Sequence, residues 1–175
     1  MKYAAFLRGI NVGGKNMIKM EALRKTFEGL GYENVRSYVN SGNLVFETRK
    51  SDDGKLAKTI HDAIENELGF DVSVMVRSMN EIVKLVADNP FDGQFDDHKY
   101  FHVFFLDREL SKDEKKLLMD LANENEMISI NGRTVYYLLR ISIIDSALGK
   151  GFIDRKLKIP ATARNWRTIT TVAAM

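Results

Sequence analysis

The sequence has no cysteine and only two prolines in 175 residues. The absence of cysteine excludes disulfide bonds, thiolate catalysis and cysteine-ligated zinc sites. Long apolar runs are also missing: Phe101–Leu106, one of the most apolar stretches, is far too short to cross a bilayer. The first residues have neither the apolar region nor the cleavage site of a signal peptide. We therefore expect a cytoplasmic protein with no membrane partner.

A strong overall charge is also absent, but the charges are unevenly distributed. The net charge is +2 at pH 7. Residues 1–40 contain seven Lys and Arg against three Asp and Glu, and residues 131–175 contain eight against two. Both ends are therefore basic and the middle is acidic, an asymmetry that can create a surface that attracts anions. The alternative is that two solvated faces differ by chance.

Apolar residues make up 45% of the chain, enough to bury a core. In the first half, apolar residues at helical spacing alternate with short strand-like runs, and Ser41-Gly42 suits a hairpin. The alternation in the last of these runs indicates a strand with one buried face. The order β-α-β-β-α-β is the ferredoxin-like unit, with antiparallel strand order 4-1-3-2 and both helices on one face. The predicted strands are Tyr3–Arg8, Val35–Asn40, Asn43–Thr48 and Val72–Arg77, and the predicted helices are Met20–Leu30 and Lys55–Leu68.

The second half predicts a degenerate copy of this unit. Phe101–Leu106 is apolar on both faces and indicates a central strand, and Ser111 with Glu114 forms a capping-box pattern. We expect an α+β fold with a ferredoxin-like unit at residues 1–92 and a second α+β unit at 93–175, packed on the first. The other predicted elements are a helix at Asn80–Ala87, a helix at Ser111–Asn123, a hairpin of Met127–Ile130 with Thr134–Arg140, an irregular or weakly helical stretch at Ser142–Pro160 and a final helix at Ala163–Ala174 capped by Thr162.

The first candidate for chemistry is the segment Arg8–Asn16, which follows a strand and contains three glycines and a lysine. Glycines let backbone N–H groups approach an anion, and lysine adds positive charge. The spacing of Gly9, Gly14 and Lys15 matches a phosphate loop, but Asn16 stands where Ser or Thr should bind magnesium. The alternative is a tight glycine turn with exposed polar ends.

The second candidate is Thr162–Thr168 at the predicted start of the final helix. Trp166 falls on the apolar side and should pack inward, which leaves Arg164 and Arg167 facing outward on the first turn. Cations there cost about 0.3–1 kcal/mol each, a cost that a bound anion would offset. The alternative is that nearby acidic side chains neutralise the arginines.

We expect the two segments to meet and to line one electropositive pocket. The turn Asn40–Asn43 is a weaker candidate, because its residue types also suit a plain turn. Three histidines, His61, His98 and His102, show no metal-ligand spacing, so we expect neither a metal nor a cofactor. The candidate ligand-binding residues are Arg8, Asn11, Gly13, Gly14, Lys15, Asn16, Ser41, Asn43, Arg164, Asn165, Arg167 and Thr168.

Four segments together resemble the bacterial domain-of-unknown-function family 1697. Residues 5–16 (AFLRGINVGGKN) are similar to its opening signature, and Tyr38–Phe46, Asn89–Phe91 and Thr162–Thr168 are similar to its later blocks, in the same order. The resemblance covers nearly the whole chain and implies an α+β fold with ferredoxin-like units. It implies no activity. Ser146 matches a serine of the family pattern, but Ala147 replaces its usual lysine.

These features favour a protein that binds an anionic ligand, either a phosphate-bearing small molecule or a nucleic-acid backbone. One alternative is an enzyme acting on a phosphorylated or nucleotide substrate. The other is an interaction domain with no small ligand. The sequence leaves the reaction, if there is one, and the oligomeric state open.

Overall fold

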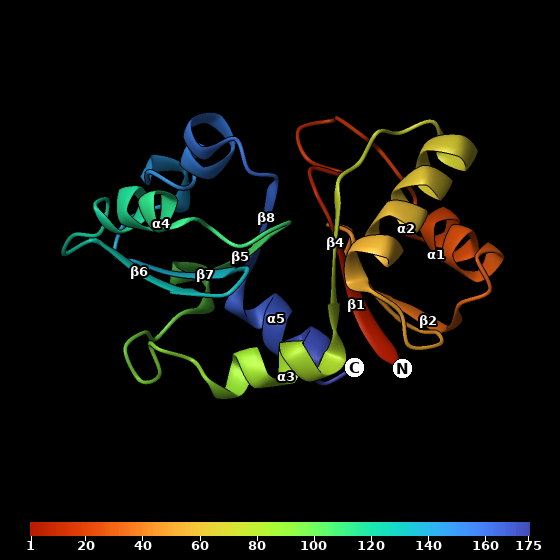
Figure 1. Cartoon of the computed structure of the whole chain (residues 1–175), viewed down its shortest axis with the longest axis horizontal. Coiled ribbons are helices and arrows are strands. Elements are labelled where there is room, and N and C mark those ends of the chain that lie inside the picture. The colour runs from red at the N-terminus through yellow and green to blue at the C-terminus, as the bar shows by residue number, and fades with distance from the viewer. The chain divides into compact units, whose positions relative to one another are not determined.

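The computed structural model describes all 175 residues and contains two compact α+β units (Figure 1). The first unit consists of Met1–Ala87 together with Thr170–Met175, and the second consists of Asp88–Ile169. The expected division into residues 1–92 and 93–175 stays a prediction. None of the helices is both long enough and apolar enough to span a membrane.

The first unit is built on a four-stranded antiparallel sheet in the order β2-β3-β1-β4. This is the predicted order 4-1-3-2, so the ferredoxin-like topology is confirmed. Elements follow the predicted ranges closely, apart from one or two residues at their ends. They are β1 (Lys2–Leu7), α1 (Met20–Gly29), β2 (Glu33–Tyr38), β3 (Asn43–Glu47), α2 (Asp53–Leu68), β4 (Val74–Ser78) and α3 (Met79–Ala87).

Helices α1 and α2 cover the same face of this sheet (Figure 1). Leu23 and Phe27 of α1 and Ile60 and Ile64 of α2 are fully buried against apolar side chains of β1, β3 and β4. Helix α2 begins where the Asp52 carboxylate accepts a hydrogen bond of 2.9 Å from the backbone of Lys55, which satisfies a free N–H group of the first turn.

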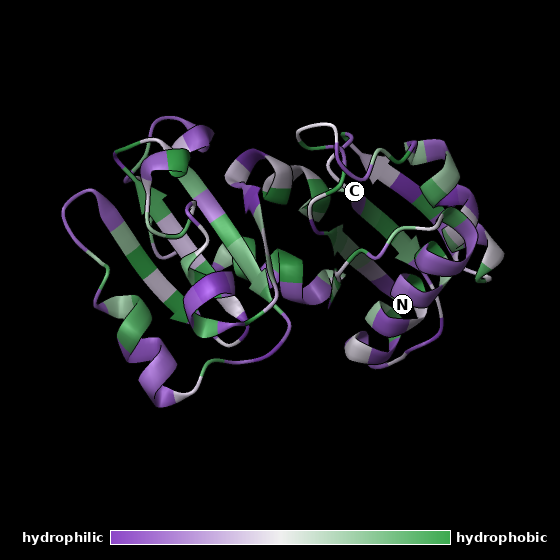
Figure 2. Cartoon of the chain, turned by 90° about the horizontal axis from the view of Figure 1, so that it is seen from above, coloured by the Kyte–Doolittle hydropathy of each residue, from purple (hydrophilic) through white to green (hydrophobic).

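The opposite face of the sheet is buried as well, which corrects the expectation of a single buried face for the last strand. Met75 and Arg77 lie on this second face of β4 and are only 2% and 4% exposed. Helix α3 follows β4 without a break and lies against β1 and β4, burying Met79, Ile82 and Leu85. The alternation of apolar and polar residues in β4 therefore did not predict which side chains are exposed, because α3 covers the second face of the sheet. Figure 2 shows hydrophobic residues concentrated in the strands.

The second unit repeats the topology of the first. Its antiparallel sheet has the order β6-β7-β5-β8, so β5 is central, as predicted. The capping box of Ser111 and Glu114 at the start of α4 is also confirmed. A 3-10 helix (Ile143–Asp145) and a π-helix (Ile153–Leu157) occupy the stretch that corresponds to α2. The elements are a 3-10 helix (His98–Tyr100), β5 (Phe101–Leu106), α4 (Lys112–Met119), β6 (Glu126–Asn131), β7 (Thr134–Leu139), β8 (Ala161–Asn165) and the first residues of α5 (Trp166–Ala173), which belongs to the first unit from Thr170 on.

The predicted start of the final helix is wrong. Residues 161–165 form β8, which pairs with β5 through a register that includes Val103 opposite Arg164. The helix begins only at Trp166. Thr162 is thus a buried strand residue and not a helix cap. The helical spacing of the apolar residues in α5 is confirmed. The residues before it form a strand because they pair with β5, which is distant in the sequence.

Each unit carries a buried arginine at the same place in its last strand. Arg77 lies opposite Ala4 of the central strand β1, and Arg164 lies opposite Val103 of the central strand β5. Each guanidinium donates a hydrogen bond of 2.8 Å to the carbonyl of the residue before it. Each strand then passes into a helix after one more residue. Residues 74–82 (VMVRSMNEI) and 161–169 (ATARNWRTI) are therefore equivalent junctions.

Candidate functional site

We call Arg8–Asn16 the glycine loop; it follows the end of β1. Its inner turn is closed by a hydrogen bond of 3.1 Å from the Lys15 N–H to the Val12 carbonyl. Gly13 and Gly14 lie between them with φ of 58° and 75°. Two successive positive φ values are typical of the tightest hairpin turns and favour glycine strongly. Turn formation thus accounts for both glycines, and it projects the residues of the turn away from the sheet.

Asn11 fastens the glycine loop to the turn between β2 and β3. Its side-chain Nδ2 donates to the carbonyl of Asn40 at 2.7 Å and to the carbonyl of Ile18 at 2.9 Å. Its Oδ1 accepts a hydrogen bond of 2.8 Å from the backbone N–H of Ile18. The amide of Asn11 is fully occupied in this way, so it holds the loop in shape. The structure therefore brings two of the predicted segments side by side in the first unit.

The turn Asn40–Asn43 is itself tightly held. Asn43 is 1% exposed and donates to the carbonyl of Tyr38 and to the Ser41 hydroxyl, both at 3.0 Å. The carbonyl of Gly42 accepts a hydrogen bond of 2.8 Å from the N–H of Leu7 at the end of β1. The polar groups of Ser41 and Asn43 thus stabilise the turn, and this turn supports the base of the glycine loop.

The tip of the glycine loop is exposed and carries groups that no other part of the chain engages. The Lys15 ammonium forms no ion pair, and the backbone N–H groups of Gly13 and Gly14 donate to no acceptor in the chain. Val12 is 64% exposed at the same tip. Asn16 closes the loop by donating to the Gly9 carbonyl at 3.2 Å. Arg8 is half-buried at the base.

The phosphate-loop alternative lacks the helix that it requires. In such loops a helix begins directly after the glycines and directs its N-terminal N–H groups at the phosphates. Here α1 begins only at Met20, several residues beyond Lys15. Asn16, at the position of the magnesium-binding hydroxyl, uses its amide to close the loop.

The prediction that Arg164 lies on an exposed helical turn is wrong. Arg164 lies in β8 and is 8% exposed, and its guanidinium donates to the Thr162 hydroxyl and to the Ala163 carbonyl, both at 2.8 Å. Burial lowers the pKa of this guanidinium to about 10. The helix-dipole argument for an anion beside Arg164 therefore no longer applies, because the side chain precedes the helix and is enclosed by protein.

The remaining residues of the second segment do surround the start of a helix. The side-chain oxygen of Asn165 accepts a hydrogen bond of 2.9 Å from the backbone N–H of Thr168, so Asn165 caps α5. Trp166 packs inward, as predicted, and stacks on Phe101 at 4.5 Å between ring centroids. Arg167 is exposed in the first turn, and its charge contributes to lowering the pKa of the Asp97 carboxyl, after the larger effect of Lys99. Such an acidic side chain near Arg167 agrees with the alternative in which nearby acidic side chains neutralise the arginines.

The candidate residues thus divide between the two units. Arg8–Asn16 and Asn40–Asn43 belong to the first unit, where hydrogen bonds join them. Arg164–Thr168 belongs to the second. That both groups line one pocket stays a prediction.

Residues 1–136 match the family described as "Protein of unknown function (DUF1697)". The match covers more than half of the sequence. The chain belongs to the DUF1697 family. No curated protein matches it.

A solved structure also resembles this DUF1697 chain. The conserved bacterial protein SP0830 from Streptococcus pneumoniae is 26% identical to it, with a TM-score of 0.75. The similarity covers 99% of this chain and 97% of the other. The fold predicted from the resemblance is therefore confirmed for both α+β units, while the family description specifies no activity.

Ser146 of the DUF1697 chain has a structural role. It is fully buried, and its hydroxyl donates to the Ile143 carbonyl at 2.7 Å and accepts from the Gly149 N–H at 3.1 Å. Close by, the Tyr137 hydroxyl donates to the Glu126 carboxylate, which also accepts from the N–H of Ala147 at 3.1 Å. These bonds fix the irregular stretch after β7. Nowhere in the chain do three His, Asp or Glu side chains converge as metal ligands would.

Sequence reasoning missed two features of the DUF1697 chain near its candidate residues. Val39 has φ of 48° and is 49% exposed, in the turn that Asn11 binds. A β-branched residue in the left-handed region is a rare strained conformation, and such strain clusters at functional sites. Arg77 was the other omission; aligning residues 74–82 with 161–169 would have revealed its equivalence to Arg164.

Proposed function

We propose that the chain binds an anionic, phosphate-bearing ligand at the glycine loop of the first unit. One observation carries the proposal: three hydrogen bonds of Asn11 fix the base of the loop, while the N–H groups of Gly13 and Gly14 and the ammonium of Lys15 lack acceptors in the chain. Backbone N–H groups in a turn form concave sites for anions, and a nearby lysine adds charge. A rigid loop also loses little conformational freedom on binding.

In this proposal the phosphate oxygens accept hydrogen bonds from Gly13 and Gly14 and pair with Lys15, while Arg8 supplies further charge at the base of the loop. Asn11, Asn16, Ser41 and Asn43 support the loop and need not touch the ligand. A charged hydrogen bond contributes about 1.5–3 kcal/mol, so losing one should weaken binding roughly tenfold to a hundredfold.

Residues of the second segment are a separate candidate in the second unit. Asn165 caps α5, and Arg167 is exposed in its first turn. Arg164 acts there as a buried support for β8. The cytoplasmic location and a bacterial source belong to the proposal as well.

The test is calorimetric titration with inorganic pyrophosphate, ATP and a single-stranded oligonucleotide. We expect at least one of them to bind, and Lys15→Ala to weaken that binding roughly tenfold to a hundredfold. Lys50→Ala is the matched control, because Lys50 is exposed beyond β3, at the opposite end of the sheet from the glycine loop. If Lys15→Ala and Lys50→Ala bind as the unaltered protein does, the glycine loop is not the site.

Salt dependence separates the two classes of ligand. Binding to a nucleic-acid backbone releases counterions, so its affinity falls steeply as salt is raised. Oligonucleotide binding that is tight at low salt, steeply salt-dependent and lost in Lys15→Ala would identify the nucleic acid. Binding of ATP and pyrophosphate with a shallow salt dependence would identify a small molecule. Failure of all three ligands to bind would favour the interaction domain.

A further inference from the structure

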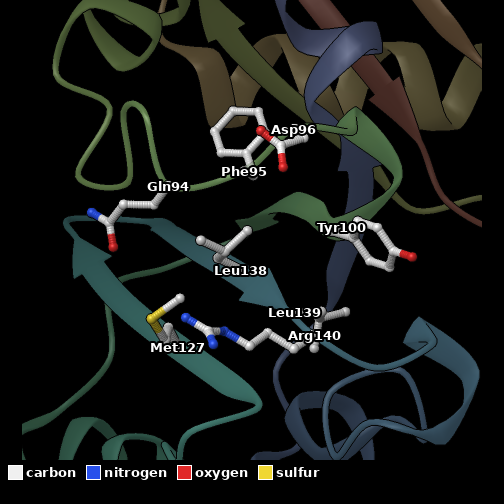
Figure 3. A pocket seen from close by; sticks show the side chains of 8 residues that line it. All are labelled: Gln94, Phe95, Asp96, Tyr100, Met127, Leu138, Leu139 and Arg140. Carbon is white, nitrogen blue, oxygen red and sulfur yellow. The ribbon is translucent and has the colours of Figure 1, made fainter.

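A pocket of about 280 Å³ opens in the second unit, and none of the candidate residues considered above lines it. The strands β6 and β7 supply one side, and the segment that precedes β5 supplies the other (Figure 3). This volume lies just below the usual range for ligand sites, so only a small ligand fits. The residues that matter to the argument are Phe95, Asp96, Tyr100, Met127, Leu138 and Arg140.

The middle of the pocket is apolar and firmly positioned. Met127 of β6 lies directly opposite Leu138 of β7 in the sheet. Phe95 is fixed from behind by Phe101, whose ring centroid lies 4.9 Å away. These side chains offer a contact surface for a flat apolar group, and the sheet underneath keeps that surface in place.

The two polar ends of the pocket carry opposite charges. Figure 3 shows Asp96 beside Phe95 on one side and Arg140 beside Met127 on the other, with Leu138 between them. The backbone N–H of Arg140 donates to the Asn125 carbonyl at 2.9 Å, which anchors this residue at the end of β7.

Neither charge is neutralised within the chain. The Arg140 guanidinium and the Asp96 carboxylate form no hydrogen bond or ion pair with any other residue. Lys99, the lysine closest in sequence to Asp96, is already paired with Asp97 at 3.2 Å. The pocket therefore presents a free cation and a free anion at opposite ends of an apolar surface.

We propose that this pocket binds a small zwitterion with a flat apolar body. Its carboxylate pairs with the Arg140 guanidinium, whose planar fork matches a carboxylate in two parallel hydrogen bonds. Its ammonium pairs with Asp96. The body between them contacts Leu138, Met127 and Phe95, and the pocket volume limits it to about one ring with short substituents. The site is independent of the glycine loop, so either proposal can fail alone.

The test is methyl NMR of the whole chain with ¹³C-labelled methionine methyl groups. Met127 is one of eight methionines, and its resonance is identified as the one missing from Met127→Leu. The probes are 4-(aminomethyl)benzoate, which carries both charges, and 4-methylbenzoate and 4-methylbenzylamine, which carry one each. We expect the zwitterion to shift the Met127 methyl resonance saturably and to bind at least about tenfold more tightly than either single-charge analogue.

Two pairs of variants complete the design. Arg140→Met and Asp96→Asn should each weaken binding of the zwitterion about tenfold or more, while leaving the binding of the analogue that lacks the corresponding charge unchanged. Lys112→Met and Asp92→Asn, which remove exposed charges outside the pocket, should change nothing. The proposal is overturned if the zwitterion does not shift the Met127 resonance or if it binds no better than its analogues. It is also overturned if the control variants weaken binding of the zwitterion as much as Arg140→Met and Asp96→Asn do.

Discussion

Replacing Gly42 by alanine tests the geometry that supports the glycine loop. Gly42 has φ of 79°, and an added Cβ would lie 2.7 Å from the Cβ of Leu7 and 2.9 Å from the Cδ1 of Ile10. Both neighbours are buried, and the Cβ of Leu7 is attached directly to the backbone of β1, so it cannot turn away. Gly42→Ala must therefore displace either the turn or the start of the glycine loop.

The expected cost has two parts. A left-handed backbone conformation costs a non-glycine residue roughly 1–2 kcal/mol, and an extra methyl group in a tightly packed site costs roughly 1–3 kcal/mol more. We expect Gly42→Ala to lower the free energy of unfolding by about 2–5 kcal/mol. Gly69→Ala is the matched control: Gly69 has φ of 75°, but no atom lies within 4 Å of its added Cβ, so only the first cost applies.

The assay is urea unfolding followed by far-UV circular dichroism, with both variants compared to the unaltered protein. The difference between Gly42→Ala and Gly69→Ala isolates the steric term, and we expect it to be about 1–3 kcal/mol. Equal costs for the two variants would show that Gly42 does not pack against Leu7 and Ile10. The described support of the glycine loop would then be incorrect.

Further predictions concern single side chains. Asn11→Ala removes three hydrogen bonds and should lower the free energy of unfolding by about 1–3 kcal/mol in the same assay, whereas Lys15→Ala should change it by less than about 0.5 kcal/mol. The side-chain hydrogen bond from Arg108 lowers the pKa of Glu114 from 4.5 to about 2. The stability that Glu114 contributes is therefore present above pH 4.5 and lost as the pH falls toward 2, so Glu114→Gln should be less stable at pH 7 and equally stable near pH 2. Burial lowers the pKa of His102 from 6.5 to about 4, so the fold loses stability as the pH falls from 6.5 to 4, and His102→Leu should flatten that slope in acid urea titrations. Hydrolysis of ATP or GTP should not exceed background; steady phosphate release that disappears in Lys15→Ala would contradict this.

The first unit was predictable because its signals are local. Helical spacing in α1 and α2, the hairpin at Ser41-Gly42 and the β-α-β-β-α-β order identified the sheet topology from sequence. Burial of Arg77 was not predictable in this way, since α3 covers a face of the sheet that the alternation indicated as polar. The contact of Gly42 with Ile10 likewise depends on how a distant loop folds back.

In the second unit, the local sequence pattern predicted the start of the final helix wrongly. Ala161–Asn165 contains few residues typical of strands, and its strand conformation depends on pairing with β5. Thr162 followed by apolar residues at helical spacing therefore read as the start of a helix, which placed Arg164 on an exposed turn. The pocket was missed for a related reason: Asp96, Met127 and Arg140 come together only through the sheet, and no short motif contains them.

An NMR titration of ¹⁵N-labelled protein with inorganic pyrophosphate tests the central claim most directly, because it observes the proposed donors themselves. We expect the backbone amide resonances of Gly13 and Gly14 to shift saturably, and the same titration of Lys15→Ala to require roughly tenfold to a hundredfold more pyrophosphate. Shifts confined to other parts of the chain, or glycine shifts that are unchanged in Lys15→Ala, would contradict the assignment of the glycine loop as an anion site.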